Sequence, residues 1–481
     1  MAAHPASSNI EGPVANTTPR VSAAVAHISD PMWQFELAAL AAANPRQIGT
    51  VRPGPANWVI QWTANVLAAL TVLAVVLRYG GTAPAKARSV ISGSPYLAAL
   101  HAEDTTRTRH LRGALEKHAA TSSSAQPAIL LLGRPSGTLA SAAARLDVNE
   151  LLDRSRMLRP LSLGSLFKGL PQAFAKLAKG TQASGDFTAP LPFRERVAIA
   201  YRIVQGAAHA AWWNSTASGL SPAPVLFGHT GTADTSQLEA AMQDRGWRTV
   251  HAVHGTNIGW PFAGLSDVAV FQTGADARLG ASLPAYGNCT HLPLAKPAVS
   301  RGNGDWALLT SYTHLLHPDF AEHGSALDRQ LVEWVRAAAQ RIGQDPARIF
   351  WRPHPQIDLV DPAEKQSLEN AVAEAGFSRW PAARPYEWLG SVSAAITAPS
   401  TVLTDALRLG QPAVVVSLSE MQSDLLYSAH PLLAQDEASL GSALRTVLDP
   451  KEREAAFDQA WNAVQPGGKA DITALLGAAG G

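Results

Sequence analysis

The sequence predicts an α/β fold in which two Rossmann-like, doubly wound domains face a cleft, preceded by an apolar helix. The chain has 481 residues, and single hydrophobic cores stop growing at about 250 to 300 residues, so two main domains are expected. From residue 127 onward, short apolar runs that end in glycine-bearing loops alternate with helical patterns, which is typical of parallel sheets covered by helices. The segment 294–306, LAKPAVSRGNGDW, has no apolar period and separates the two halves.

Composition excludes several classes of partner and site. The 39 basic residues nearly balance 38 acidic ones, for a formal charge of +1, so no polyanion-binding surface and no nucleic-acid partner are expected. The single cysteine, Cys289, cannot form an internal disulfide, and no Cys and His residues stand at zinc-ligand spacing. We therefore expect a fold held by packing in a reducing compartment, with no metal and no cofactor.

The N-terminal region divides into a tail and an apolar helix. Residues 1–57 are predicted to be a flexible tail with a short helix, because the first thirty residues or so lack periodicity and the features of a secretory signal. Residues 58–78 run without a charge until Arg78, which is the length of a bilayer-spanning helix. Lys86 and Arg88 follow, and such a positive flank would keep the rest of the protein in the cytoplasm.

A polar stripe argues against a simple spanning helix. Asn57, Gln61 and Asn65 recur at four-residue spacing, as in a helix that is buried against a domain or lies in a membrane interface. Two interpretations stay open: contact with the cytoplasmic face of the membrane, or a buried helix of a soluble domain.

The first domain is predicted over residues 90–295 and the second over 305–450, with a closing helix and tail over 451–481. Strands of the first are expected at 128–133, 224–231, 248–255 and 266–274, with a capped amphipathic helix from Asp234 that stops at Gly246. Strands of the second are expected at 306–311, 347–355, 393–399 and 412–417. In open parallel sheets ligands bind at the carboxyl ends of the strands, so the loops there are the places to look for chemistry.

His354 lies in such a loop, in the stretch FWRPHPQ. Pro353 and Pro355 fix the backbone around the imidazole, which can donate to a phosphate oxygen, and Arg352 could add positive charge. The alternative is a plain turn, because His-Pro pairs also occur at His4, His317 and His430.

The stretch ITAPSTVLTDALRLG provides a second candidate site. Ser400 and Thr401 lie where a buried strand turns into a helix, so their hydroxyls and the free amides of the helix start could bind an anion. The alternative is that Ser400 is only an N-cap. Asp405, one turn into the helix, could contact a ribose hydroxyl or simply complement the helix dipole.

A second histidine, His254, ends a strand of the first domain and precedes Gly255 and Thr256. The glycine permits close approach of a substrate, and a neutral imidazole is the usual proton acceptor near pH 7, so His254 is our candidate general base. His251, inside the strand, fits a core or rim position better. Weaker candidates are Ser311 and Thr313, which could contact phosphate, and His229 on the opposite wall. His314, His317 and His323 match no metal template.

Taken in order, the strand with HGT, the strand with RPHP, and the strand with PST and an aspartate five residues on resemble bacterial surface-polysaccharide transferases of the GT-B fold. Over residues 224–430 the chain is similar both to the CDP-glycerol glycerophosphotransferase family and to bacterial sialyltransferases and Kdo transferases, all of which use cytidine-nucleotide donors.

The resemblance implies roles for individual residues. His254 would be the catalytic base and His354 would contact the donor diphosphate, as in the glycerophosphotransferases, while His354, Ser400 and Thr401 would hold the cytidine phosphate, as in the sialyltransferases. The chain lacks the paired acidic residues followed by glycine that house the sialyltransferase base, and it has Ala-Pro before Ser400 where glycerophosphotransferases usually carry an aspartate.

The function implied is that of a metal-independent transferase in capsule or other surface-polysaccharide synthesis. It would move a sugar or polyol phosphate from a nucleotide-activated, CMP- or CDP-linked donor, bound by the second domain, to a glycan or lipid-linked acceptor on the first. Two alternatives are a GT-B enzyme that uses a UDP- or GDP-sugar, which would be expected to carry glutamate at position 405, and a noncatalytic assembly protein that keeps the fold.

Overall fold

A computed structural model describes most of the chain. The described residues are 55–101, 127–132, 156–183, 193–228, 232–253, 266–281, 288–291, 295–313, 323–380, 386–419, 430–464 and 475. The predicted tail, residues 1–57, lies almost wholly outside them.

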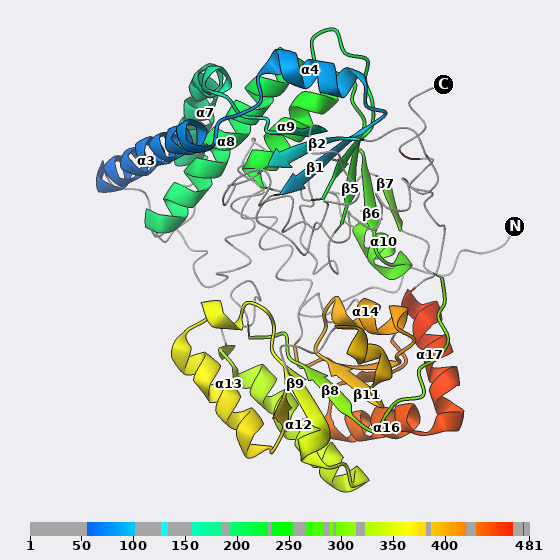
Figure 1. The fold of residues 1–481 in the computed structure, drawn as a ribbon. Coiled ribbons are helices and arrows are strands. Elements are labelled where there is room, and N and C mark those ends of the chain that lie inside the picture. The colour runs from blue at the N-terminus through cyan, green and yellow to red at the C-terminus, as the bar shows by residue number, and fades with distance from the viewer. Residues whose placement is uncertain are drawn as a thin grey trace, which may run out of the picture.

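Two parallel sheets organise the described residues (Figure 1). The N-terminal sheet has the strand order β3-β2-β1-β4-β5-β6-β7 and the C-terminal sheet the order β10-β9-β8-β11-β12-β13, with every pairing parallel. Counted within each domain, both orders begin 3-2-1-4-5-6, the order of the dinucleotide-binding Rossmann fold. The predicted fold class, two doubly wound α/β domains, is confirmed.

The N-terminal strands are β1 Leu97–His101, β2 Ala128–Leu132, β3 Met157–Leu158, β4 Val225–Phe227, β5 Thr249–Ala252, β6 Val268–Phe271 and β7 Asn288–His291. The C-terminal strands are β8 Trp306–Leu309, β9 Ile349–Arg352, β10 Ser378–Arg379, β11 Ala394–Thr397, β12 Ala413–Val416 and β13 Leu433–Ala434. The helices are α3 Pro55–Tyr79, α4 Pro84–Ser92, α7 Leu163–Ala183, α8 Phe193–Thr216, α9 Ala233–Gln243, α10 Gly274–Ala281, α12 Ala326–Ile342, α13 Pro362–Glu374, α14 Val402–Arg408, α16 Glu437–Leu448 and α17 Pro450–Val464, with short 3-10 turns η5 Pro346–Arg348, η6 Ile357–Leu359 and η7 Tyr386–Ser391.

The C-terminal sheet has a separate core on each face. Trp306, Leu308 and Trp351 pack on the face covered by α12, α13 and α16, whereas Ala307 and Leu309 pack on the face covered by α14, η7 and α17. This alternation within one strand follows from the two-residue period of a β-strand. Because both faces are covered, the central strands β8, β9, β11 and β12 are largely apolar, which is why the sequence pattern located them.

Helices α3, α7 and α8 form a bundle on the outer side of the N-terminal sheet, and α9 lies between α8 and the sheet (Figure 1). The helix predicted from Asp234 onward is α9, and the prediction that it is amphipathic is wrong. Its polar side chains are buried as well, among them Asp234, Gln237 and Glu239, because α8 covers the side that would otherwise face solvent. Gln237 donates to the carbonyl oxygens of Ile203 and Ala233 at 3.0 Å.

Replacing Gly206 tests the close approach of α8 to α9. A Cβ at this position would lie 2.2 Å from the carbonyl oxygen of Ala233, which is backbone and cannot swing aside. We expect Gly206→Val to lower the free energy of unfolding by about 2 to 3 kcal/mol, measured by urea denaturation. Gly164→Ala in α7 is the control, because nothing lies within 4 Å of a Cβ there. An equal loss in both variants would contradict the close packing.

Helix α3 turns its polar stripe toward the domain. Its polar residues Gln61 and Asn65 face inward and are buried, and Gln61 donates to Asn65 at 2.9 Å. Arg196 of α8 donates to Gln61 at 3.2 Å. The outward side of α3 is apolar. By length and composition α3 could also cross a membrane over Val59–Tyr79.

Candidate functional site

The strand order of the C-terminal sheet reverses between the neighbouring strands β8 and β11. From β8 the chain proceeds to β9 and β10 on one side, and from β11 to β12 and β13 on the other. The loops after β8 and β11 therefore leave the same edge of the sheet next to each other, and the amide of Ala398 donates to the carbonyl oxygen of Leu309 at 3.2 Å. Ligands of doubly wound sheets bind at such a switch point, outside the carboxyl ends of the strands.

His354 stands in the loop that follows β9 at this edge. Its carbonyl oxygen accepts from the amide of Ile357 at 3.0 Å, so the residue closes into the turn η6. The ring nitrogen Nδ1 accepts from the amide of Gln356 at 3.3 Å. Accepting at Nδ1 places the ring proton of a neutral imidazole on Nε2, which is then a donor.

Burial lowers the pKa of His354 to about 4, since the charged imidazolium would lose its hydration. At neutral pH the ring is therefore neutral. In this state the ring can donate from Nε2 and carries no positive charge. The prolines on either side restrict the backbone that carries the ring.

This pKa predicts a specific acid sensitivity. Between pH 6.5 and 4 the unfolded chain binds a proton at His354 that the folded chain does not, so the stability contributed by this group is complete above pH 6.5 and is lost as the pH falls toward 4. We expect the free energy of unfolding, measured by urea denaturation, to fall less steeply with falling pH between 6.5 and 4.5 in His354→Gln than in wild type. The difference in slope should be up to about 1.4 kcal/mol per pH unit. Equal slopes in the two proteins would contradict the lowered pKa.

The loop after β8 is held by a carboxylate that the sequence analysis did not find. Asp328, in the first turn of α12, accepts from the amides of Ser311 at 3.3 Å, Tyr312 at 3.2 Å and Thr313 at 2.7 Å. Asp328 is 1% exposed. Burial raises the pKa of this carboxyl, and the hydrogen bonds from the three residues oppose that rise.

The two candidates in this loop, Ser311 and Thr313, are themselves buried. Their backbone amides are directed at Asp328 and are therefore not available to a ligand phosphate. Tyr312 between them crosses to the other side of the switch point, where its hydroxyl accepts from the amide of Leu418 at 2.9 Å. The loop after β8 is thereby fixed both to α12 and to the loop after β12.

Ser400 has the contacts of a helix-start residue. Its hydroxyl accepts from the amide of Val402 at 3.3 Å and lies 3.2 Å from the hydroxyl of Thr397. Thr401 is the N-cap of α14 and makes no side-chain cap hydrogen bond. The two residues follow β11 at the switch point, as expected, and the cap-like geometry of Ser400 agrees with the plainer of its two interpretations.

Two charged candidates have partners within the domain. Asp405 forms an ion pair with Arg408, one turn further along α14, with 3.6 Å between Arg408 Nη1 and Asp405 Oδ1. The guanidinium of Arg352 lies over the ring of Trp380, 5.7 Å from its centroid. Trp380 in turn packs edge to face against Trp388, at 4.4 Å between ring centroids. Arg352 thus makes a cation–π contact with a tryptophan pair that was not among the predicted site residues.

The candidates in the N-terminal domain, His229, His254, Gly255 and Thr256, lie outside the described residues. Their preceding strands are described: β4 ends at Phe227 and β5 at Ala252, next to each other in the sheet. His251 in β5 is buried, in line with the expected core or rim position. Across the residues that the structure describes, no three His, Cys, Asp or Glu side chains are grouped to hold a metal ion.

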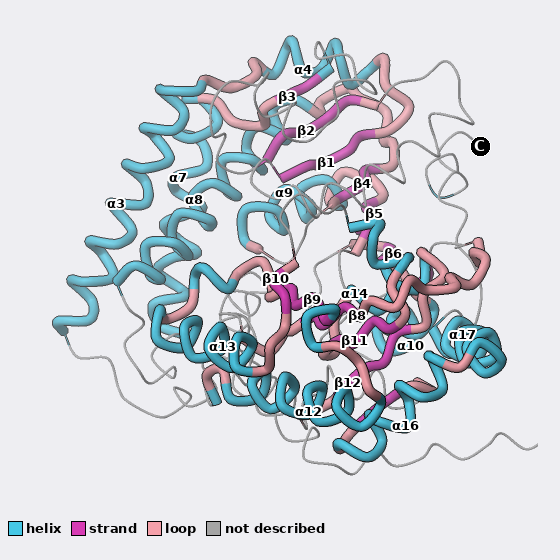
Figure 2. Tube along the Cα trace, turned by 60° about the horizontal axis from the view of Figure 1, so that its bottom comes forward, coloured by secondary structure: helices cyan, strands magenta, loops and turns pink. Residues whose placement is uncertain are grey.

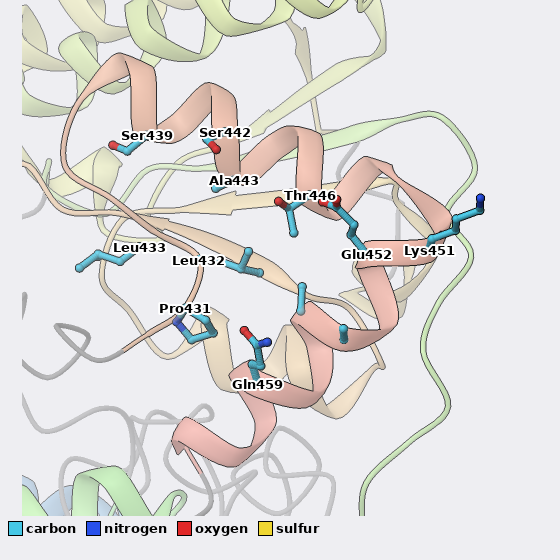
Figure 3. Close-up of a pocket in the computed structure, with 12 residues that line it drawn as sticks. Pro431, Leu432, Leu433, Ser439, Ser442, Ala443, Thr446, Lys451, Glu452 and Gln459 are labelled. Carbon is cyan, nitrogen blue, oxygen red and sulfur yellow. The ribbon is translucent and has the colours of Figure 1, made fainter.

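A cavity of about 550 Å³ opens elsewhere on the C-terminal domain (Figure 3). Side chains of α16, such as Ser442 and Thr446, line one side, and those of α17, such as Gln459, line another. No candidate residue lines this cavity. We therefore place the candidate site at the switch point, where the loops that carry the candidates of the C-terminal domain leave the sheet.

No protein-family model matches this chain, and no curated protein does. Among solved structures it is similar to a UDP-forming α,α-trehalose-phosphate synthase from Burkholderia xenovorans, with 12% identity, a TM-score of 0.45 and coverage of 77% of this chain and 95% of that one. It is also similar to a putative UDP-N-acetylglucosamine 2-epimerase from Listeria monocytogenes, with 13% identity, a TM-score of 0.43 and coverage of 79% and 93%. A third is an O-GlcNAc transferase mutant from Thermobaculum terrenum, with 12% identity, a TM-score of 0.40 and coverage of 97% and 79%.

Proposed function

We propose that the chain is a transferase that binds a nucleotide-activated sugar or polyol phosphate at the switch point of its C-terminal domain. The observation that carries the proposal is His354, a fixed and neutral hydrogen-bond donor in the loop after β9, on the edge of the sheet where the loops after β8 and β11 also end. Rossmann sheets bind nucleotides at this edge.

The proposed chemistry uses groups that flank the switch point. Nε2 of His354 donates to an oxygen of the leaving phosphate, and the Arg352 guanidinium offsets part of the charge that develops there. Ser400 and Thr401 border the phosphate from the β11 side, and Ser311 and Thr313 from the β8 side. Asp405 is the candidate for the nucleotide ribose. The proposal needs no metal ion, because these donors serve the phosphate directly.

The N-terminal domain is proposed to bind the acceptor. His254, followed by Gly255 and Thr256, would take the proton of the acceptor hydroxyl as it attacks, and His229 would line the same side. Because the ordered motifs resemble cytidine-nucleotide transferases, we propose a CMP- or CDP-linked donor and a glycan or lipid-linked acceptor in capsule or other surface-polysaccharide synthesis. The chain would act in the cytoplasm, on the cytoplasmic face of the membrane.

Thermal-shift profiles with CMP, CDP, UDP and GDP test the donor site. A nucleotide at about 100 times its Kd should raise the Tm by about 5 to 10 °C. We expect CMP or CDP to do so, His354→Ala to lose most of the shift, and Glu374→Ala to keep it, because Glu374 is exposed and ends α13, where Gly376 packs on Pro346 before the start of β9. Stabilisation by UDP or GDP alone would refute the cytidine donor. No stabilisation by any nucleotide would refute the donor site and favour a noncatalytic assembly protein.

A further inference from the structure

Helix α3 is apolar on its exposed side as well as on its buried side. A surface helix normally buries its apolar side and exposes its polar one. Here the buried side contains Ala64, Ala68, Val72, Val75 and Val76 together with the polar Gln61 and Asn65, and the exposed side carries Val59, Ile60, Trp62, Leu67, Leu70 and Leu77. Leu70 is 56% exposed and Leu77 66%.

The two hydroxyls near this exposed side are satisfied within the helix. Thr63 donates to the carbonyl oxygen of Val59 at 2.9 Å, and Thr71 to that of Leu67 at 2.7 Å. A threonine that bonds back to its own helix needs no water for its donor, which suits a helix in contact with an apolar medium.

Helix α7 extends the same surface. Leu163 and Phe167 of α7 are exposed, Phe167 to 61%. Trp62 of α3 stacks on Phe174 of α7, with 5.9 Å between ring centroids, so the two helices present one face. Figure 2 shows α3, α7 and α8 side by side along one flank of the molecule, with α3 outermost. Contiguous apolar surfaces of this kind mark interaction sites.

The charges on these two helices have a single sign. Residues 55–79 and 163–183 contain no Asp or Glu, and their charged residues are Arg78, Lys168, Lys176 and Lys179. Helices that carry exposed apolar residues and basic residues but no acidic ones fit an anionic lipid surface, because the headgroups pair with the cations while the apolar side chains enter the boundary with the acyl chains. A twofold dimer through the same face would place the basic residues of two copies together without an acid to pair them.

We propose that the outer face of α3, with Leu163 and Phe167 of α7, docks onto an anionic phospholipid bilayer, and that α3 lies in the interface without crossing it. Crossing would require α3 to leave α8. It would then carry Gln61 and Asn65 into the hydrocarbon and leave Arg196 without its contact to Gln61. In the docked arrangement these polar groups keep their partners.

Vesicle flotation of the full chain tests the docking. Wild type should float with vesicles of phosphatidylglycerol and phosphatidylethanolamine, and at least about tenfold less with phosphatidylcholine alone. The double variant Leu70→Glu, Leu77→Glu should reduce the bound fraction on anionic vesicles at least about tenfold. Leu359→Glu is the matched control, because Leu359 is 64% exposed but belongs to the C-terminal domain, and it should float like wild type. Circular dichroism melts should show that all three proteins are folded.

Three results of flotation and sedimentation would overturn the docking. One is wild type that floats with none of the vesicles, and another is a double variant that floats as well as wild type. The third is a wild type that is a dimer in sedimentation velocity and a double variant that is a monomer, with neither protein bound to vesicles. That result would show that the face contacts a second copy of the chain. Alkaline carbonate washing tests the orientation: release of the protein supports an interfacial helix, and retention would show that α3 crosses the bilayer.

A labelled chain locates the contact itself. Cys289 is the single cysteine, so a Cys289→Ser background allows a fluorophore to be attached at one chosen position. One protein carries an environment-sensitive fluorophore at Leu70→Cys, and a second protein, the control, carries it at Leu359→Cys. The emission at position 70 should shift to the blue when anionic vesicles are added, and the emission at position 359 should not. Equal responses at both positions, or none at position 70, would contradict the proposed face.

Discussion

Arg453→Ala is expected to lower the free energy of unfolding by about 3 to 5 kcal/mol, the largest loss that we predict from one side chain. Arg453 is 5% exposed and lies at the start of α17. Its guanidinium donates to the carbonyl oxygens of Ser300, Val392, Ser393 and Val447 and to the amide oxygen of Gln411. Removing it would leave these buried acceptors without a donor.

These acceptors come from four separate segments of the chain. Ser300 belongs to the connection between the domains, Val392 and Ser393 precede β11, Val447 ends α16, and Gln411 precedes β12. All are neutral oxygens, so the guanidinium is held without a carboxylate, and burial lowers its pKa to about 10. It is still charged at neutral pH, which strengthens each of these hydrogen bonds.

A further variant distinguishes the hydrogen-bonding geometry of the guanidinium from its positive charge, and another serves as a control. Arg453→Lys should recover less than half of the loss, because a single ammonium cannot reach acceptors spread around a planar fork. Arg445→Ala is the control, an exposed arginine in the neighbouring α16, and it should change stability by less than about 0.5 kcal/mol. Urea denaturation measures all three. If lysine restored full stability, positive charge alone would account for the effect.

The same connection explains the glycine that follows α14. Gly410 has φ of 75°, and the amide of Ser300 donates to its carbonyl oxygen at 2.8 Å. A Cβ on Gly410 would lie 2.0 Å from the carbonyl oxygen of Ala298. The glycine therefore both ends α14 and admits the interdomain chain against the domain.

The predicted strands have continuous apolar sequences, whereas β1 and β7, which were not predicted, do not have a strand-like sequence pattern. Buried runs such as AILLL in β2 and AVVV in β12 are continuous and apolar, as central parallel strands must be. β1, LAALH, consists mainly of residues that favour helices, and β7, NCTH, is polar, so neither has a strand pattern. Their neighbours in the sheet, and not their own propensities, make them strands.

The candidate site was predictable where topology alone determines position. His354, Ser311 and Ser400 each follow an apolar strand, and parallel strands end at one edge, so their proximity to the switch point follows from the pattern. Asp328 was not predictable, because its three amide donors lie 15 to 17 residues away and it resembles any acid in a first helical turn. The inward direction of Gln61 was missed because its partner, Arg196, is 135 residues away.

Replacing Asp328 is expected to have the second largest effect, because it acts on stability and on the candidate site together. Asp328→Ala should lower the free energy of unfolding by about 3 to 4 kcal/mol, since the buried amides of Ser311, Tyr312 and Thr313 would lose their shared acceptor. Because those amides fix the loop after β8, the variant should also lose the thermal shift that a nucleotide produces in wild type.

Asp328→Asn separates the carboxylate from the shape of the side chain. An amide keeps one acceptor oxygen but turns an NH₂ group toward at least one of the backbone amides, so we expect about half the loss of Asp328→Ala. Glu333→Gln on the exposed side of the same helix should change neither stability nor the thermal shift. If Asp328→Asn behaved like wild type in both measurements, shape alone would hold the loop. If Asp328→Ala lost stability but kept the full nucleotide shift, the loop after β8 would not be part of the nucleotide site.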